Sequence, residues 1–409
     1  MMENRYDKYK DSGIAWIGEI PEHWEVTSFK RKITINNGKD YKDFLDAEVY
    51  PVMGSGGCFA YCSNYIYDGE ALLLGRKGTI DKPLYVKGKF WVVDTMFYAI
   101  PHADLHCKFA YYLALIFPFN LYSTSTSLPS LTQTDLGNIL VAFPFLSEQQ
   151  SIAAYLDQKC GEIDELITLQ EEMITKLQSY KQSVITEAVT KGLDKNVPLK
   201  DSGIEWIGEI PEHWSKNKII RLFSIIGSGT TPKSSKEDNY NGSINWIQSG
   251  DINGGDIEIC KNTISYTAFK EYPALKIYQA PFIIVAMYGA SVGNISISQI
   301  DGCVNQACCV MNETKQNFKY LFYAMNSVKK YLIYRAEGGG QPNISQDKIK
   351  NTWLPIPPLS EQQSIADYLD QRCSEIDELI SIKQQKIEKL KEYKKSLIFE
   401  CVTGKRKVS

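Results

Sequence analysis

The chain has 409 residues, of which 44% are hydrophobic and 23% charged, and its formal net charge at pH 7 is −3. This length and composition predict two to four ordinary globular domains. The near-neutral charge argues against a basic protein that binds DNA tightly by itself. The chain has no run of eighteen apolar residues, and its charged N-terminus is not followed by an apolar segment. We therefore expect no membrane span, no secretory signal and a cytoplasmic location.

The ten cysteines are unevenly spaced, and the adjacent Cys308 and Cys309 suit neither a disulfide framework nor a zinc ribbon. Reduced thiols are the simplest expectation in the cytoplasm. His102, His106 and Cys107 could begin a metal site, but the chain has only four histidines and no evident second pair of ligands. We expect these three residues to have a surface or core role.

An internal repeat dominates the sequence. DSGIAWIGEIPEHW at residues 11–24 recurs 190 residues later with one difference in fourteen positions. LSEQQSIAAYLDQKCGEIDELI at residues 146–167 recurs 213 residues later with three differences in twenty-two positions. The stretches between these motifs, 25–145 and 215–358, share little sequence, and the second is 23 residues longer. This layout indicates a common frame that carries two inserts with different recognition roles.

Each LSEQQ motif predicts the start of a long helix. Ser147–Gln150 and Ser360–Gln363 have the S-x-x-Q pattern of a capping box. The first helix should end near Thr190, before Gly192 and Pro198, after roughly 60 Å. Apolar positions follow at alternating spacings of four and three, as in a coiled coil. The predicted seam contains Leu156, Ile163, Ile167, Ile174, Leu177 and Val184, and Leu369, Ile376, Ile380, Ile387, Leu390 and Leu397.

The seam is interrupted at Gln170 and Lys181, and at the matching Lys383 and Lys394. Such a seam must be buried, and the two helices have the same length and register. We therefore expect them to pair antiparallel, with approximate twofold symmetry and the inserts at opposite ends. In the alternative, each helix packs separately on its own insert.

The inserts predict mixed α/β domains with many short strands. Strands are expected within 71–80, 89–100, 281–298 and 302–311, and short helices at 108–116 and 318–326. Both inserts end with a similar segment, 128–138 and 341–351, and a strand containing proline. The predicted fold class is thus α/β (α+β), with two mixed domains joined by a pair of long antiparallel coiled-coil helices.

Motifs for enzyme chemistry are not found. The chain contains no G-x-x-x-x-G-K-[ST] phosphate loop, no N-P-P-[FY] of adenine methyltransferases and no glycine-rich cofactor loop between a strand and a helix. Two of its four histidines, His23 and His213, belong to the repeated frame motif. We therefore expect no catalytic residue.

The two frame motifs, the paired heptad helices and the insert segments LLLGRKGTI, AMYGASVGNISI and GGGQPNISQDKI together carry a family resemblance. Over nearly its whole length the sequence resembles the specificity (S) subunit of type I restriction–modification systems. The resemblance implies that each insert is a target recognition domain that reads one half of a bipartite site in double-stranded DNA. It further implies that the helices set the spacing and dock two modification (M) subunits, which bind S-adenosylmethionine. Restriction (R) subunits would add ATP- and Mg²⁺-dependent activity, so this chain would hold no cofactor.

This organisation implies six segments. They are a frame segment at 1–24, the first recognition domain at 25–146, a helix at 147–191, the repeated frame segment at 192–214, the second recognition domain at 215–358, and the last helix with a basic tail at 359–409.

Candidate DNA contacts were chosen as cations for phosphates and as polar side chains that can read base edges. Arg76, set between Gly75 and Lys77–Gly78, is the best single candidate, because glycines permit a close backbone approach and arginine pairs with guanine. The candidates in the first insert are Lys39, Tyr41, Arg76, Lys77, Lys82, Tyr85, Lys87, Lys89, Ser127, Ser130 and Gln133. Those in the second are Thr230, Thr231, Lys233, Ser235, Lys236, Gln248, Ser249, Asp251, Asn253, Tyr288, Ser291, Asn294, Gln341 and Asn343.

The tryptophan pairs of the frame, Trp16 with Trp24 and Trp206 with Trp214, are expected to anchor it by burial. The alternative is that they face the M subunits. Two other functions stay open at this point: a non-catalytic scaffold that binds two proteins through unlike inserts, and a self-contained DNA enzyme with an unrecognised site.

Overall fold

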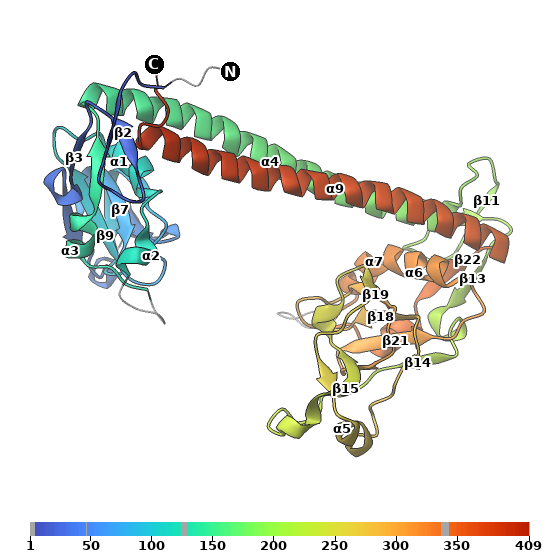
Figure 1. Ribbon diagram of the computed structural model, residues 1–409. Helices are drawn as coiled ribbons and strands as arrows, with labels where there is room; N and C mark the ends of the chain where they lie inside the picture. The colour runs from blue at the N-terminus through green and yellow to red at the C-terminus, as the bar shows by residue number, and fades with distance from the viewer. Residues whose placement is uncertain (1–4, 46, 124–128, 337–342, 409) are drawn as a thin grey trace. The chain divides into compact units, whose positions relative to one another are not determined.

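The computed structural model describes residues 5–45, 47–123, 129–336 and 343–408 (Figure 1). The chain divides into two compact units, Met1–Glu172 with Lys383–Ser409, and Met173–Ile382. The first unit therefore draws on both ends of the chain, whereas the second is continuous. None of the helices in the described ranges is long and apolar enough to cross a membrane.

The first unit is built on a six-stranded sheet with strand order β4-β9-β7-β8-β5-β6. Side chains alternate across β7: Leu72 and Leu74 face the core that contains Phe109, whereas Ala71 and Leu73 face a smaller core. Its elements are β1 (Tyr9–Asp11), β2 (Glu19–Pro21), β3 (Glu25–Ser28), β4 (Ile33–Asn37), β5 (Tyr50–Gly54), β6 (Gly57–Cys62), β7 (Tyr67–Gly75), β8 (Leu84–Val92), β9 (Met96–Pro101), α1 (Cys107–Ala114), α2 (Phe119–Tyr122), α3 (Gln133–Asn138) and β10 (Leu140–Phe143).

The second unit has a five-stranded sheet, β14-β21-β18-β19-β16, and a three-stranded sheet, β17-β15-β20. Every residue of β18 is buried, because Ile283 and Val285 face one core and Phe282 and Ile284 face another. Its elements are β11 (Leu199–Asp201), β12 (Glu209–Pro211), β13 (Ser215–Lys218), β14 (Ile225–Gly227), β15 (Tyr240–Ile247), β16 (Asp256–Ile257), β17 (Thr263–Ile264), α5 (Tyr266–Glu271), β18 (Phe282–Ala286), β19 (Ile295–Ser298), β20 (Cys303–Val304), β21 (Cys308–Asn312), α6 (Phe318–Ser327), α7 (Lys329–Tyr334), α8 (Gln346–Lys350) and β22 (Trp353–Ile356).

Two long helices, α4 (Leu146–Lys191) and α9 (Leu359–Val402), lie side by side and antiparallel within each unit (Figure 1). In the first unit Lys394 Nζ lies 2.6 Å from Asp164 Oδ2, and in the second Lys181 Nζ lies 2.6 Å from Asp377 Oδ2. Lys181 and Lys394 are two of the four residues that interrupt the predicted seam, and each of these two forms an ion pair between the helices. The predicted antiparallel pair is confirmed within each unit.

The predicted seam is buried or half-buried throughout. Leu156 and Ile163 share one core with Leu397 of the other helix and with Trp24 and Phe29 of the first unit. Each helix therefore packs on an insert and also on the other helix, so the pairing is confirmed and the alternative of separate packing is wrong. The fully buried seam residues are Leu156, Ile163, Val184, Leu369, Ile376, Ile387 and Leu397, and the half-buried ones are Ile167, Ile174, Leu177, Ile380 and Leu390.

The predicted capping boxes are wrong in register. Helix α4 begins at Leu146, and the carbonyl of Phe145 already accepts the N–H of Gln149 at 3.0 Å. Gln149, rather than Gln150, bonds back to the insert: its Nε2 donates to the Pro144 carbonyl at 2.9 Å. Gln362 makes the same bond to the Pro357 carbonyl at 2.8 Å in the second unit. The helix start is therefore fixed by a buried glutamine and not by serine.

Several predicted strands are shorter than expected. The 71–80 prediction is correct only to Gly75, because the backbone N–H of Arg76 turns to the carbonyl of Thr95 at 2.9 Å. The 89–100 stretch is divided by a turn at 93–95, and 281–298 by a loop between β18 and β19. The two short helices are confirmed as α1 and α6.

Candidate nucleic-acid interface

In the first unit, the residues that follow β7 meet two other segments, at Thr95 and at 129–131. The N–H of Leu131 donates to the Arg76 carbonyl at 3.0 Å, and the N–H of Gly78 donates to the Pro129 carbonyl at 2.9 Å. Lys77 also forms an isolated β-bridge with Ser130. Three predicted DNA contacts, Arg76, Lys77 and Ser130, are thus brought together by backbone bonds.

Lys39 joins this group from another part of the sheet. Its N–H donates to the Val92 carbonyl at 2.8 Å, and its carbonyl accepts from Trp91 Nε1 at 2.8 Å. A Cβ at the preceding Gly38 would lie 2.0 Å from the Val93 carbonyl oxygen, so only glycine permits this approach. Lys39 is therefore placed beside the 93–95 turn.

The Arg76 side chain reaches the same turn. Its Nη1 donates to the Asp94 carbonyl at 3.3 Å, and its guanidinium lies 5.9 Å from the centre of the Phe97 ring. The 93–95 turn therefore links Lys39 on one side to Arg76 on the other.

Phe59 also belongs to this surface and was missed by sequence reasoning. It is 58% exposed, its ring would contact a Cβ added at Gly54 at 3.2 Å, and it meets Tyr41 edge-on with centroids 5.8 Å apart. Val93 lies near the same glycine. No sequence signal marked Phe59, because an exposed aromatic residue in a strand has the same pattern as a buried one.

The second unit repeats this backbone arrangement with other side chains. The N–H of Met287 donates to the Ala307 carbonyl at 2.7 Å, and the Met287 carbonyl accepts the N–H of Ile344 at 2.7 Å. Met287, Tyr288 and Asn343 therefore occupy the places of Arg76, Lys77 and Ser130. The glycines that follow, Gly78 and Gly289, have matching φ values of 80° and 87°.

Thr230 takes the place of Lys39. Trp246 Nε1 donates to the Thr230 carbonyl at 3.2 Å, and a Cβ at Gly229 would lie 1.8 Å from the Val304 carbonyl oxygen. The next residue, Thr231, donates its hydroxyl to Gln306 Oε1 at 2.6 Å. Gln306 was not among the predicted contacts, since nothing in the sequence places it beside residue 231.

Several predicted contacts of the first insert lie elsewhere. The Tyr85 ring lies 5.4 Å from Lys108 Nζ of α1, and burial, together with Glu70, raises the pKa of its hydroxyl. Lys87 pairs with Glu70 at 2.9 Å, and Lys89 lies over Tyr65. Gln133 Nε2 donates to the Ile35 carbonyl at 3.0 Å, Lys82 is exposed in the β7–β8 connection, and Ser127 lies outside the described residues. The structure does not bring these side chains to Arg76.

In the second insert, Ser291 and Asn294 tie two loops together. The Ser291 hydroxyl donates to the Ser249 carbonyl at 2.6 Å, and Asn294 Nδ2 donates to the Ile252 carbonyl at 3.0 Å. Lys329 Nζ in turn donates to Asn294 Oδ1 at 2.7 Å, and burial lowers the pKa of this lysine. Both polar side chains thus hold the loops in place.

The other predicted residues of this insert also have local partners. Asp251 accepts the N–H of Gln248 at 2.8 Å, and Asn253 accepts that of Gly255 at 3.0 Å. Lys236 Nζ pairs with Glu271 at 2.5 Å. Lys233 and Ser235 are exposed on the loop before Lys236, and Gln341 lies outside the described residues.

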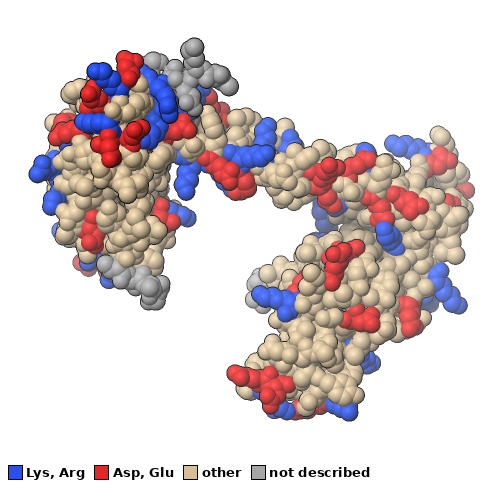
Figure 2. Space-filling view, viewed as in Figure 1, with Lys and Arg blue, Asp and Glu red and all other residues tan. Residues whose placement is uncertain are grey.

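Charge on the visible face is mixed. Figure 2 shows acidic and basic side chains interspersed over both units, with broad uncharged areas on the inserts. This agrees with the net charge of −3. The face shown in Figure 2 therefore has no extended basic patch among the described residues.

The sequence matches the type I restriction modification DNA specificity domain twice, over residues 21–178 and 211–392. This chain belongs to the type I restriction modification DNA specificity family. Each match covers one insert and much of one long helix, so the family unit is present in two copies. Residues 25–146 and 215–358 are accordingly called the first and second recognition domains.

Known relatives align with this chain over nearly its whole length. One relative is the putative specificity subunit of the type I restriction enzyme MjaX from Methanocaldococcus jannaschii. It is 26% identical over 427 residues, which covers 96% of each chain. The MjaVIII specificity subunit of the same organism is 24% identical over 428 residues, covering 95% of this chain and 94% of its own. A solved chain from a study of complex assembly and conformational transition of the type I R-M system shares the fold, with a TM-score of 0.72 and 17% identity, covering 94% of this chain and 98% of its own.

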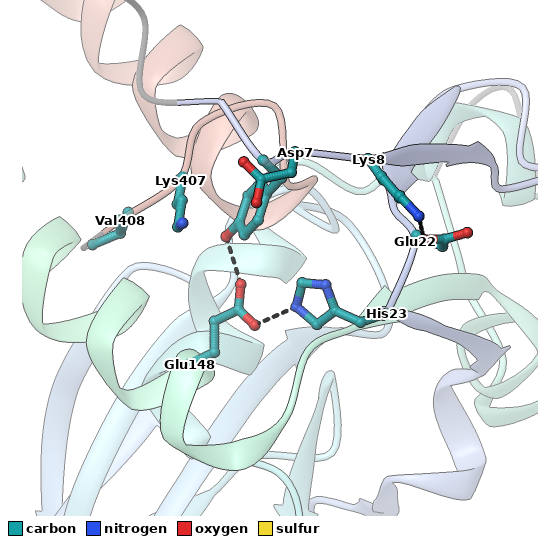
Figure 3. A pocket seen from close by; sticks show the side chains of 8 residues that line it. Asp7, Lys8, Glu22, His23, Glu148, Lys407 and Val408 are labelled. Carbon is teal, nitrogen blue, oxygen red and sulfur yellow. Dashed lines mark hydrogen bonds and ion pairs between the residues drawn. The ribbon is translucent and has the colours of Figure 1, made fainter.

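In each unit, the glutamate of the LSEQQ motif joins the start of a long helix to the DSGI…EHW frame motif. In the first, Glu148 accepts from Tyr6 Oη at 2.5 Å and bonds His23 Nε2 at 2.8 Å (Figure 3). Glu148 also accepts from Trp24 Nε1 at 3.2 Å. In the second, Glu361 bonds His213 at 2.7 Å and Trp214 at 2.9 Å. The frame motif and the helix start are thus joined in the same way twice.

The frame tryptophans are mostly structural. Trp24 and Trp214 are fully buried, as the anchoring interpretation predicted. Trp16 and Trp206 are half-buried and pack on Phe117 and Tyr331, with centroids 6.2 Å and 6.1 Å apart. Whether the half-buried pair faces an M subunit stays a prediction.

Each recognition domain is fastened to a long helix by an aspartate. Asp157 pairs with Lys108 and accepts from the Tyr112 hydroxyl at 2.9 Å. Asp370 pairs with Lys319 and accepts from the Tyr323 hydroxyl at 2.8 Å. The chemistry is identical in the two copies, in contrast to the loops at Arg76 and Met287.

The three residues considered for a metal site have other surroundings. The His102 ring is bonded to Thr34 Oγ1 at 3.0 Å and to the Arg31 carbonyl at 3.1 Å. Burial raises the pKa of the Cys107 thiol to about 12, and His106 stands at the start of α1. Among the described residues no group of three His, Cys, Asp or Glu side chains is arranged to hold a metal ion.

Large apolar side chains also lie on the outer faces of the helices. Leu166 and its repeat partner Leu379 are 43% and 47% exposed, and Tyr393 and its partner Tyr180 are 51% and 49% exposed. The ion pair of Lys394 with Asp164 places Tyr393 opposite the helical turn that contains Leu166, and the ion pair of Lys181 with Asp377 does the same for Tyr180 and Leu379. Each unit thus exposes one leucine and one tyrosine, on opposite long helices, at equivalent positions of the repeat.

Proposed function

We propose that this chain is the non-catalytic DNA-reading subunit of a type I restriction–modification complex, and that each recognition domain reads one half of a bipartite site in double-stranded DNA. The observation that carries the proposal is the matched pair of loop sets. The backbone bonds of Arg76 to Thr95 and Leu131 recur as bonds of Met287 to Ala307 and Ile344, whereas the side chains differ. A common scaffold with different side chains suits two readers of different half-sites.

The side chains define the expected chemistry. Lys39 and Lys77 are exposed and suit phosphate contacts, which position a protein on DNA without selecting sequence. Arg76 can pair with the O6 and N7 atoms of guanine, and Asn343 with adenine. We therefore expect the first half-site to include a guanine contact and the second an adenine contact.

The repeated exposed leucines and tyrosines of the long helices support docking of two copies of one partner. Leu166 with Tyr393 and Leu379 with Tyr180 have equal chemistry, so the same M subunit surface can bind each. S-adenosylmethionine would bind in the M subunits, and ATP and Mg²⁺ in the R subunits, leaving this chain without a cofactor. The complex would act in the cytoplasm, with no membrane partner. The helices would hold the half-site centres about one helical turn, roughly 34 Å, apart.

A domain exchange tests the reading role. Replacing residues 25–145 with the matching insert of a relative should change one half of the methylated motif and leave the other half and the spacer unchanged. Methylome sequencing of a host that expresses the chimera gives the result. A change in both halves, or a new spacer with the helices intact, would contradict two independent readers on a fixed frame.

A mobility-shift assay with and without the M subunit tests the division of labour. We expect binding of the specific duplex that depends on the M subunit. No DNA binding in either case would favour a protein scaffold, and methylation or cleavage by the chain alone would favour an enzyme. Leu166→Asp with Leu379→Asp should weaken M subunit binding, whereas Glu171→Gln, on the same helix, should not.

A further inference from the structure

The most exposed large apolar side chain of each unit, among the described residues, occupies the same position of the repeat. Leu121 in α2 is 71% exposed, and Tyr334 in α7 is 88% exposed. The two residues are 213 positions apart, which is the offset of the LSEQQ motif. Their neighbours Phe119 and Leu332 are related by the same offset, and both are buried in the core. A large exposed apolar side chain is therefore a feature of this repeat position in both units.

Helix α7 is fastened to the loop that follows β18. Lys329 Nζ at its start donates to Asn294 Oδ1 at 2.7 Å. A Cβ added at Gly293 would lie 2.9 Å from Cγ1 of Ile333, so the helix packs directly on this loop. The same loop contains Tyr288, which takes the place of Lys77 in the repeated interface. Tyr334 is thus carried on an element that is anchored to the reading surface.

The residues around Tyr334 favour a polyanion. Lys330, four residues before Tyr334, and Arg335, directly after it, are both exposed, and α7 contains no acidic residue. Arg335 also lies 5.5 Å from the centre of the Tyr331 ring, which keeps its guanidinium near the helix. Tyrosine and arginine on such a surface can contact sugars, base edges and phosphates of a duplex.

The repeat distinguishes two kinds of exposed apolar position. Positions with equal chemistry in both units, such as Tyr180 and Tyr393, suit a partner that binds twice. Positions with matched structure but different side chains include Arg76 and Met287, where the half-sites would be read. Leu121 and Tyr334 differ in the same way, so they belong to the second kind.

We infer that Tyr334 and Leu121 are DNA-contact positions of the second and first recognition domains, where each helps to select its own half-site. The inference rests on the proposed function and adds a pair of specificity positions to it. The ligand at both is duplex DNA. The differing ring and alkyl side chains contribute to the difference between the two half-sites.

Photo-crosslinking in the full complex tests this directly. p-Azidophenylalanine is placed at Tyr334, at Leu121 or at Tyr180 as a matched exposed tyrosine on the helix face, and the chain is assembled with its M subunits on a duplex that carries the methylated motif. We expect the position of Tyr334 to label the half-site read by the second domain, that of Leu121 to label the other half, and that of Tyr180 to label the M subunit. In addition, Tyr334→Ala should lower affinity for the duplex roughly tenfold, about 1.4 kcal/mol, and Tyr334→Phe much less.

The outcomes separate this inference from the proposed function. If the complex binds the duplex but the azide at Tyr334 labels only protein, or labels nothing, Tyr334 is not a DNA contact and the inference is overturned while the proposed function stands. If the wild-type complex does not bind the duplex at all, both fail. Labelling of the same half-site from both positions would also overturn it.

Discussion

Glu148 and Glu361 offer a matched pair of substitutions that compares the two units. Glu148→Ala removes the acceptor for Tyr6, His23 and the fully buried Trp24, whereas Glu361→Ala removes it for only two groups. A buried donor left unpaired costs about 1–3 kcal/mol. The Glu148 side chain is 18% exposed and that of Glu361 is 40% exposed, so water can replace more of the lost bonds in the second unit.

We therefore expect Glu148→Ala to destabilise the first unit by about 3 kcal/mol and Glu361→Ala to destabilise the second by about 1–2 kcal/mol. Hydrogen exchange, followed by mass spectrometry on peptides from each unit, measures the two opening free energies separately. Tyr6→Phe should destabilise the first unit by only part of the loss caused by Glu148→Ala, because it removes one bond to Glu148 and leaves the other two. Equal losses for the two alanine variants, or a larger loss in the second unit, would refute the idea that Glu148 closes the first unit through three bonds.

Three further changes test the interface and the helix pair. Gly75→Ala places a Cβ 2.3 Å from the Thr79 carbonyl oxygen, so the loop that carries Arg76 should shift and one half of the methylated motif should relax, whereas Gly56→Ala has open space and should leave the motif unchanged. Asp164→Lys places a like charge beside Lys394 and should lower the melting temperature. Adding Lys394→Asp reverses the pair and should restore the melting temperature; no restoration would show that the ion pair does not stabilise the helix pair. Ile163→Asp buries a charge at a position that is 5% exposed and should cost 3 kcal/mol or more, about the scale of a severe core change; a loss near zero in denaturant titration would contradict the seam.

The helical frame of the fold was predictable from the sequence because its motifs occur in two nearly identical copies. A seam with one period and one register in two equal helices has few ways to be buried, and the antiparallel pair follows. Even the interruptions carried information, since Lys181 and Lys394 are the partners of Asp377 and Asp164. The exact helix start was not predictable, because the choice between Ser147 and Gln149 depends on an insert that the helix packs against.

The candidate interface was only partly predictable. Arg76, Lys77 and Ser130 were candidates from residue type alone, and the backbone bonds that bring them together were not predicted. The bond from Asn294 Nδ2 to the Ile252 carbonyl was not predictable, because the two residues are 42 positions apart and meet only in the folded domain. The equivalence of Arg76 and Met287 is invisible in sequence, since it consists of backbone bonds between segments that share no residues.

The composition of the first unit has a consequence for how the protein is made. Its core contains Trp24 and Phe29 together with Leu397, Ile398 and Cys401, so residues translated first are covered by residues translated near the end. The main core of the second unit, by contrast, is drawn from residues within Met173–Ile382, so it can pack before the last residues of the chain are made. During synthesis the core of the later unit can therefore close before that of the earlier one, and a chain cut short after residue 382 would lack the part of the first core that α9 supplies.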